Sequence, residues 1–220
     1  MCNQPHTPKS FASLQPDSFD AVVVAGGDFP THAVPLTLVE QARMLVACDS
    51  AGEELIRRGY IPTAIIGDCD SMSQEFLTAH RDIIYKVEEQ DYNDLTKATR
   101  FCVERGCRRI AYVGATGKRE DHTLGNISLL DFYRREMHIA ALMATDHGVF
   151  LSASGTTELA TFAGQQVSIF NLTCSHLEGD GLRWQPYAFA AMWQGTLNEA
   201  TGESITLRGD GSYMVYGVYE

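Results

Sequence analysis

The sequence predicts an α/β protein, in which an N-terminal parallel sheet covered by helices (an α/β/α domain) is followed by a small antiparallel β-sandwich. Up to about residue 145, short continuous apolar runs alternate with segments of helical periodicity, which is typical of a buried parallel sheet. Beyond that point β-branched and aromatic residues dominate, and turn signals recur about every 8–12 residues. We therefore expect two domains, residues 1–145 and 146–220, the second too small to build a strong core alone.

Six apolar runs are expected to form the strands of the first domain. Several of them stop at a glycine or an aspartate, as at Gly26 and Asp49. Apolar runs without alternation fit strands that are buried on both faces. The six runs cover residues 21–25, 44–48, 64–66, 83–85, 110–113 and 139–143.

Three segments of the first domain carry helix signals. Residues 51–58 have acids early and arginines late, which suits the helix dipole, and Gly59 follows as a stop. Residues 94–105 repeat apolar side chains on one stripe, and Gly106 comes directly after them. Residues 122–135 again place leucine and isoleucine on one face. We expect a helix over each segment.

The second domain has the residue pattern of antiparallel strands and shows no helical periodicity. We expect strands over residues 167–170, 187–193, 204–207 and 213–219. The segment Arg208-Gly209-Asp210-Gly211, between the last two, predicts a hairpin turn.

The composition excludes several classes of protein. With 45% hydrophobic and 20% charged residues the chain is an ordinary globular protein, and its formal net charge of −11 argues against nucleic acid as a partner. No apolar run is long enough to span a bilayer, and the N-terminal segment has no apolar core of a signal peptide. The six cysteines form no CxxC pair, so we expect a cytoplasmic protein without disulfides.

Acidic residues are concentrated where the second and third predicted strands end. Asp49 ends one strand, and Asp68 and Asp70 follow the other in Gly-Asp-Cys-Asp-Ser. Open parallel sheets bind ligands beyond the carboxyl ends of their strands. Carboxylates that converge there repel one another, so a cation between them is expected, and Mg²⁺ prefers such oxygen ligands. For this short motif alone, a solvated turn with helix-capping acids is the more frequent explanation.

The segment from Glu89 to Lys97 adds a second group of polar residues after the fourth strand. Asp94 begins a predicted helix, and Lys97 lies three residues further on the same face. One interpretation is a helix start with a surface ion pair; the other is a third metal ligand beside a phosphate-binding lysine.

Residues 114–122, Gly-Ala-Thr-Gly-Lys-Arg-Glu-Asp-His, link a strand to a helix through two glycines and two basic residues. Backbone amides at such a helix start favour anions, and Arg119 could fork onto phosphate oxygens. The spacing is neither that of a Walker A loop nor GxGxxG. His122 is more simply a helix-start hydrogen bonder than a catalytic base.

In this order and spacing, the segments resemble the thiamine pyrophosphokinase family. The resemblance rests on Asp49, on residues 67–71, 89–97 and 114–122, and more loosely on residues 181–184 and 195–199. It implies transfer of a pyrophosphoryl group from ATP to the hydroxyethyl oxygen of thiamine, with release of AMP. It also implies an α/β domain followed by a β-sandwich, in a homodimer that binds thiamine where subunits meet.

The resemblance also implies roles for individual residues. Mg²⁺ would be held by Asp68, Asp70 and Asp94. Asp49 and Asp121 would complete the catalytic set, and ATP would be bound by Thr116, Lys97, Arg119 and Asp121. Gln90 and Asn198 would hydrogen-bond thiamine.

Three positions depart from the family's pattern. Ser50-Ala51 follow Asp49 where the family usually has glycines, Lys118 replaces the second glycine of a Gly-Gly-Arg loop, and Leu197 stands where serine often precedes Asn198. The last change keeps open an enzyme of the same fold that acts on another alcohol. A binding protein for thiamine or a nucleotide, without turnover, is the other alternative.

Overall fold

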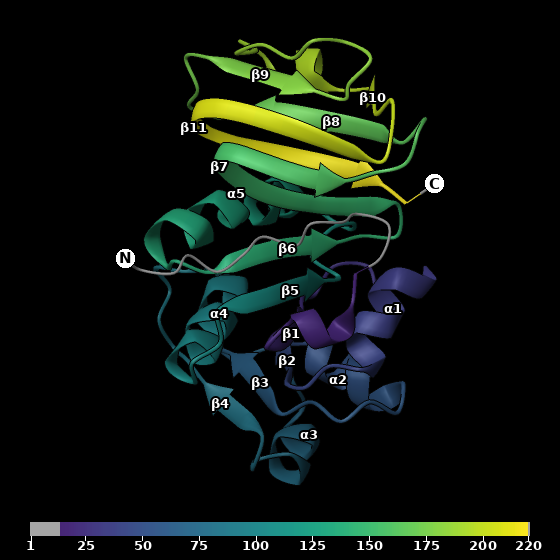
Figure 1. Cartoon of the computed structure of the whole chain (residues 1–220). Coiled ribbons are helices and arrows are strands. Elements are labelled where there is room, and N and C mark those ends of the chain that lie inside the picture. The colour runs from purple at the N-terminus through teal and green to yellow at the C-terminus, as the bar shows by residue number, and fades with distance from the viewer. Residues whose placement is uncertain (1–13, 220) are drawn as a thin grey trace. The chain divides into compact units, whose positions relative to one another are not determined.

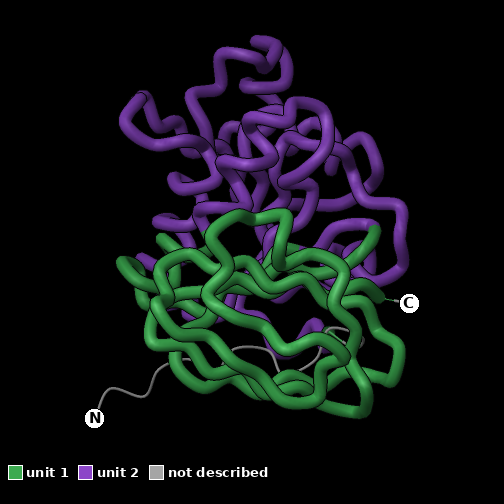
Figure 2. Tube along the Cα trace, turned by 90° about the horizontal axis from the view of Figure 1, so that it is seen from above, with its two compact units in different colours: residues 1–14, 130–143, 147–220 green, residues 15–129, 144–146 purple. Residues whose placement is uncertain are grey.

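The computed structural model describes residues 14–219, which form two compact units. One unit comprises residues 15–129 and 144–146; the other comprises residues 130–143 and the chain from residue 147 onward (Figure 2). The N-terminal segment, which is expected to carry no signal peptide, and Cys2 lie outside the described residues.

The first unit contains a parallel sheet in the order β5-β1-β2-β3-β4 (Figure 1). Its central strands are short and wholly buried, as the continuous apolar runs predicted. In the register, Val23 of β1 lies beside Val46 of β2 on one side and Tyr112 of β5 on the other. The strands are β1 (Ala21–Val24), β2 (Leu45–Cys48), β3 (Ala64–Gly67), β4 (Ile84–Lys86) and β5 (Arg109–Val113).

Helices cover both faces of this sheet. In Figure 1, α4 lies on one side of the strands and α1 and α2 lie on the other. The predicted helices are confirmed as α2 (Ala51–Arg57), α4 (Asp94–Glu104) and α5 (Glu120–Glu136), the last of which continues into the second unit. The sequence did not reveal α1 (Ala33–Glu40), α3 (Gln74–Ala79) or the 3₁₀ turn Pro16–Ser18.

The missed helix α1 begins with an unusual cap. The Nδ1 atom of His32 accepts a hydrogen bond from the Val34 amide at 3.3 Å. The carboxylate of Asp146 accepts further bonds from the backbone amides of Thr31 and His32, at 2.9 and 3.1 Å. Histidine is not among the usual N-cap residues, and the support from Asp146 is distant in the sequence, so no local signal marks this helix start.

The second unit is built from antiparallel strands around one long pair. Strand β11 pairs with β7 on one side, and on the other its early part pairs with β9 and its later part with β8. The strand order is β10-β8-β11-β7-β6, with β9 beside β11. The strands are β6 (Ala140–Ala144), β7 (Gly148–Ala160), β8 (Gln166–Asn171), β9 (Leu177–Asp180), β10 (Asn198–Glu199) and β11 (Ser204–Val218).

Two expectations for this unit were wrong. Residues 187–193 form no strand: they run as an irregular segment into a 3₁₀ turn, Met192–Gly195. Two of the aromatic side chains that suggested a strand, Tyr187 and Trp193, are exposed, so burial did not select them. The hairpin turn at residues 208–211 is also absent, because β11 continues through it with a shift of register between Gly209 and Ser212. The two glycines make room for an irregularity in a strand rather than for a turn.

A buried ion pair joins α5 to the strands of the second unit. The Arg134 guanidinium donates to Asp131 Oδ1 at 2.7 Å, to Ser152 Oγ on β7 at 3.0 Å and to Ser212 Oγ on β11 at 2.6 Å. Ser152 also donates to Asp131 Oδ1 at 2.8 Å. Burial alone would raise the pKa of Asp131, but the hydrogen bonds from Arg134 and Ser152 outweigh it and hold that pKa below its ordinary value.

The described cysteines, Cys48, Cys69, Cys102, Cys107 and Cys174, are all free and buried. This agrees with the expectation of thiols that pack as small hydrophobic side chains. Within residues 14–219 no helix is long and apolar enough to cross a membrane.

Candidate active site

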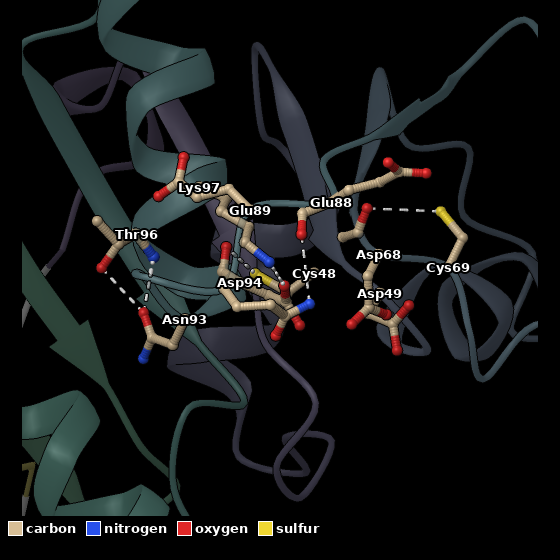
Figure 3. A network of polar contacts seen from close by, with 12 residues as sticks. Cys48, Asp49, Asp68, Cys69, Glu88, Glu89, Asn93, Asp94, Thr96 and Lys97 are labelled. Carbon is tan, nitrogen blue, oxygen red and sulfur yellow. Dashed lines mark hydrogen bonds and ion pairs between the residues drawn. The ribbon is translucent and has the colours of Figure 1, made fainter.

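The carboxyl ends of β2 and β3 bring Asp49 beside the loop of residues 68–71 (Figure 3). Ser71 Oγ donates to Asp49 Oδ2 at 2.5 Å, and the Asp70 amide donates to Asp68 Oδ1 at 3.2 Å. Gly67 allows the two strand ends to approach, because a Cβ there would lie 2.9 Å from that of Asp49. The neighbouring strand ends therefore place these acids together as the sequence predicted.

This acidic group has the electrostatic character of a cation site. Asp49 has a φ of 41°, and its Oδ1 atom is buried with no hydrogen-bond partner among the described residues. A buried acceptor without a donor is costly unless something else binds it. Burial raises the pKa of the nearby Cys69 thiol, and the negative charge of Asp49 raises it further. The donor set therefore suits a hard cation such as Mg²⁺.

The predicted metal ligands are not gathered into a finished centre. In residues 14–219, no three His, Cys, Asp or Glu side chains lie close enough together to hold a metal ion. Asp68 and Asp70 share one loop, whereas Asp94 lies at the start of α4 and contacts Lys97 instead. Joint ligation by these three carboxylates remains a proposal.

The start of α4 is defined by Asn93, which caps it. Asn93 Oδ1 accepts hydrogen bonds from the Thr96 amide at 3.0 Å and from Thr96 Oγ1 at 2.9 Å (Figure 3). Asp94 is thereby left free of capping, and its Oδ1 atom lies 3.0 Å from Lys97 Nζ. The Lys97 side chain is only 4% exposed, so its charge is removed from bulk water beside a single carboxylate. The pair of Lys97 and Asp94 is therefore more deeply buried than the solvated surface ion pair of the alternative interpretation.

The loop of residues 114–118 is joined to the loop that follows β1. The Gly27 amide donates to the Gly114 carbonyl at 2.7 Å, and the Asp28 amide donates to the Thr116 carbonyl at 2.9 Å. A Cβ on Gly27 would lie 2.2 Å from the Thr116 carbonyl oxygen, so this contact requires glycine. The two glycine-bearing loops therefore form one surface at the carboxyl ends of β1 and β5.

The guanidinium of Arg119 forms an ion pair with the carboxylate of Asp121. Its Nε atom lies 3.1 Å from Asp121 Oδ1 and its terminal nitrogen lies 2.6 Å from Asp121 Oδ2. The hydrogen bond from Arg119 lowers the pKa of Asp121 and raises the pKa of the guanidinium. The pair is exposed, so a phosphate could compete for the guanidinium, and Asp121 already orients its planar fork.

A cavity of about 660 Å³ lies over the loops that follow β1 and β2. The sequence named Ser50 and Lys118 only as departures from the family's pattern and did not predict this cavity. The Gly26-Gly27 pair directly after β1 was the signal that could have found it. Other residues that line the cavity are Gly26, Asp28, Glu53, Glu54, Arg57 and Arg58.

The two residues expected to bind thiamine have different surroundings. Gln90 is exposed in the first unit, and its Nε2 atom donates to the Glu88 carbonyl at 3.4 Å. Asn198 is buried in the second unit; its Oδ1 atom accepts from the Trp184 amide at 3.1 Å, and its Nδ2 atom donates to the Trp184 carbonyl at 2.7 Å. Asn198 therefore holds Trp184 in place, and its contact with thiamine stays a proposal.

An α/β unit with acids at its strand ends and a glycine-bearing loop before a helix defines the class of open α/β proteins that bind ligands beyond the carboxyl ends of their strands, here followed in the chain by an antiparallel unit. Residues 36–141 match the family model of the thiamin pyrophosphokinase catalytic domain, and residues 148–216 match that of its substrate-binding domain. The chain belongs to the thiamin pyrophosphokinase family.

Curated relatives support this membership. A thiamine pyrophosphokinase of Bacillus subtilis is 33% identical over 118 residues, which is 49% of this chain and 52% of the relative. Thiamine pyrophosphokinase 1 of rice is 30% identical over 156 residues, covering 60% of this chain and 58% of the relative. The matched regions thus span little more than half the length of these relatives.

Solved structures share the fold over almost the whole chain. The thiamine pyrophosphokinase structure from Bacillus subtilis superposes with a TM-score of 0.75 at 20% identity, covering 91% of this chain and 99% of the other. That from Candida albicans gives a TM-score of 0.78 at 14% identity, covering 100% of this chain and 95% of the other. The expected α/β fold with a following antiparallel domain is confirmed.

Proposed function

We propose that this protein transfers a pyrophosphoryl group from ATP to thiamine, giving thiamine diphosphate and AMP. One observation carries the proposal: the catalytic and substrate-binding family models match consecutive parts of the chain in that order. The acidic strand ends, the buried Lys97 and the glycine-bearing loops lie within the matched catalytic region. In this assignment, the domain boundary near residue 145 falls between the two matched regions.

In the proposed reaction, the thiamine hydroxyl oxygen forms a bond to the β-phosphorus of ATP, and the bond from that phosphorus to the AMP oxygen breaks. Such a transfer requires alignment and neutralisation of charge more than covalent help from the protein. Lys97 and Arg119 would hold phosphate oxygens, with Thr116 and Asp121 completing the ATP side. Asp121 would orient Arg119, as its bidentate contact allows.

Asp68, Asp70 and Asp94 would hold Mg²⁺, with Asp49 beside them. The buried Asp49 Oδ1 atom without a donor supports a cation in this place. When bound, the metal would neutralise the negative charge of the phosphates. Asp49 itself would remain oriented by Ser71, which donates to its other oxygen.

We further propose a homodimer in which thiamine contacts Gln90 of one subunit and the Asn198 region of the other. The second unit exposes several large apolar side chains, among them Trp184, Tyr187 and Trp193, at 53%, 53% and 74%. Exposed aromatic residues of this kind are enriched at protein interfaces. We place the protein in the cytoplasm, where its buried free thiols would stay reduced.

The test is release of AMP from ATP and Mg²⁺ with and without thiamine. We expect AMP and thiamine diphosphate in equal amounts, and little AMP when thiamine is left out. If thiamine binds but no AMP forms, the protein is a binder. AMP formation that requires a different alcohol would instead assign another acceptor to the same fold.

A further inference from the structure

Lys118 adopts a backbone conformation that does not suit a lysine. Its φ is 56°, in the left-handed region that favours glycine, and it directly follows Gly117 at φ 80°. A residue other than glycine in this region is strained, and such strain persists where the side chain has a use. The contacts of the Lys118 side chain should therefore show what that use is.

The Lys118 side chain reaches across to the neighbouring loop. Its Nζ atom donates to the Gly26 carbonyl at 2.7 Å. Both residues line the cavity of about 660 Å³ at the ends of β1 and β2. An ammonium has three donors, and this bond uses one of them. The amine therefore lies at the wall of the cavity with donors remaining for a ligand.

Lys118 forms no ion pair with a carboxylate of the described residues. Arg57 and Arg58, the other cations that line the cavity, both form ion pairs with Glu54. For Lys118, the described residues provide only the neutral carbonyl of Gly26. Because Asp28 and Glu53 add negative charge to the same wall, an anion that enters the cavity needs this ammonium.

We propose that Lys118 is a nucleotide-binding residue, whose ammonium contacts the phosphate chain of the nucleotide in this cavity. This rests on the proposed function, which supplies ATP as the ligand. The Gly26 carbonyl holds the amine in place before binding. A phosphate oxygen then gains a charge-assisted hydrogen bond, which is stronger than a bond to a neutral carbonyl.

The test compares three variants of Lys118 with one control. Lys118→Met keeps the aliphatic stem and the strained backbone but removes the charge, and Lys118→Arg keeps the charge. Lys118→Gly removes both the charge and the strain. Arg43→Met is the control, because Arg43 is exposed, pairs with the exposed Asp17 and does not line this cavity.

Binding is measured as the thermal shift with Mg²⁺ and a non-hydrolysable ATP analogue, without thiamine, and the KM for ATP is measured separately. We expect Lys118→Met and Lys118→Gly to raise the nucleotide Kd about tenfold, and Lys118→Arg to keep it within about threefold. The melting temperature of ligand-free Lys118→Gly should equal or exceed that of the wild type. The loss in Lys118→Met should shrink at high salt, since it is electrostatic.

Two results would overturn the proposal. One is a nucleotide Kd in Lys118→Met and Lys118→Gly equal to that of Arg43→Met; the other is a wild type that binds no nucleotide. If Lys118→Met only lowers the ligand-free melting temperature, the lysine is a structural link between loops. The binding measurement needs no turnover, so it still tests Lys118 if thiamine proves not to be the acceptor.

Discussion

The ammonium of Lys97 lies 3.0 Å from Oδ1 of Asp94, one helical turn earlier, with its side chain only 4% exposed. A lysine desolvated to this degree is held by that one carboxylate. The Asp94 side chain remains 34% exposed, so the pair has one side open to a ligand. This geometry allows Lys97 to exchange part of its contact for a phosphate oxygen.

Lys97→Met tests this role. The methionine fills a similar volume, so we expect the fold to be retained and kcat to fall by about 10²–10³-fold. The measurement is AMP release at saturating ATP and thiamine, with circular dichroism to confirm folding.

A double-variant cycle separates catalysis from structure. Asp94→Asn leaves the buried Lys97 charge without its partner and should destabilise the protein by about 3 kcal/mol. Adding Lys97→Met should restore much of that stability. Activity should stay lost in the double variant. Recovery of activity together with stability would show that the pair is only structural.

The acidic loop after β3 gives the second prediction. Asp70 is exposed and makes no ion pair within the described part of the chain, so Asp70→Asn should change the unfolding free energy by less than about 0.5 kcal/mol. We expect kcat to fall by orders of magnitude and extra Mg²⁺ to restore little of it. The Mg²⁺-dependent thermal shift should fall in parallel.

Asp82→Asn provides a matched control for this variant. Asp82 is also an exposed aspartate, and among residues 14–219 it pairs only with the exposed Arg81. It should behave as the wild type in both measurements. Near-normal turnover in Asp70→Asn would mean that the acids of this loop have a structural role.

The ion pair of the second unit gives a prediction about pH. The pKa of Asp131 is lowered in the folded protein, so its charged form stabilises the fold at pH values above its unfolded pKa. That stability is lost as the pH falls through the lowered folded pKa, below about pH 4. Asp131→Asn should cost about 2 kcal/mol at pH 7.

The measurement is the melting temperature of wild type and Asp131→Asn from pH 7 to pH 2. The difference should be roughly 4–8 °C at pH 7 and should shrink as the pH drops below about 4. Glu136→Gln, at an exposed ion pair on the same helix, should show no such difference. A constant gap between wild type and Asp131→Asn would exclude ionisation of Asp131 as its cause.

The sequence predicted the parallel sheet well because its strands are buried on both faces. Runs such as Ala21–Val24 and Leu45–Cys48 are apolar throughout, and no competing pattern obscures them. The helix α4 was equally clear, since its apolar residues Leu95, Ala98, Phe101 and Cys102 recur at helical spacing and Gly106 ends it. Local rules were sufficient where burial and propensity agreed.

Predictions failed where distant contacts decide the structure. Asp146 holds the backbone of Thr31 and His32 just before α1, and the aromatic residues of 187–193 lie outside any strand. At the site, residue order placed Asp49 near the loop of Asp68 and Asp70, but it gave no sign that Asn198 would hold Trp184. Such side-chain partners depend on tertiary packing, which one sequence does not display.

The last prediction concerns the proposed sharing of the thiamine site between subunits. Gln90 and Asn198 belong to different units of the chain, and the family resemblance assigns both to one substrate. If one subunit contributes Gln90 and its partner contributes Asn198, each site needs two chains. We expect a dimer in sedimentation, and Gln90→Ala should raise the thiamine KM by about fivefold, as for one lost hydrogen bond.

Subunit mixing tests this arrangement directly. Asp70→Asn should inactivate the catalytic side of a site, and Asn198→Ala should damage the thiamine side, partly by releasing Trp184. In a mixed dimer with a shared site, one site carries both changes and the other carries neither. At low thiamine concentration each mixed dimer should therefore work at about half the wild-type rate, and the mixture should exceed the summed activity of the two parents. If subunit exchange is confirmed and activity stays at the parental sum, both residues of a site come from one chain. A monomer in sedimentation would also exclude sharing, while leaving the ATP side of the proposal intact.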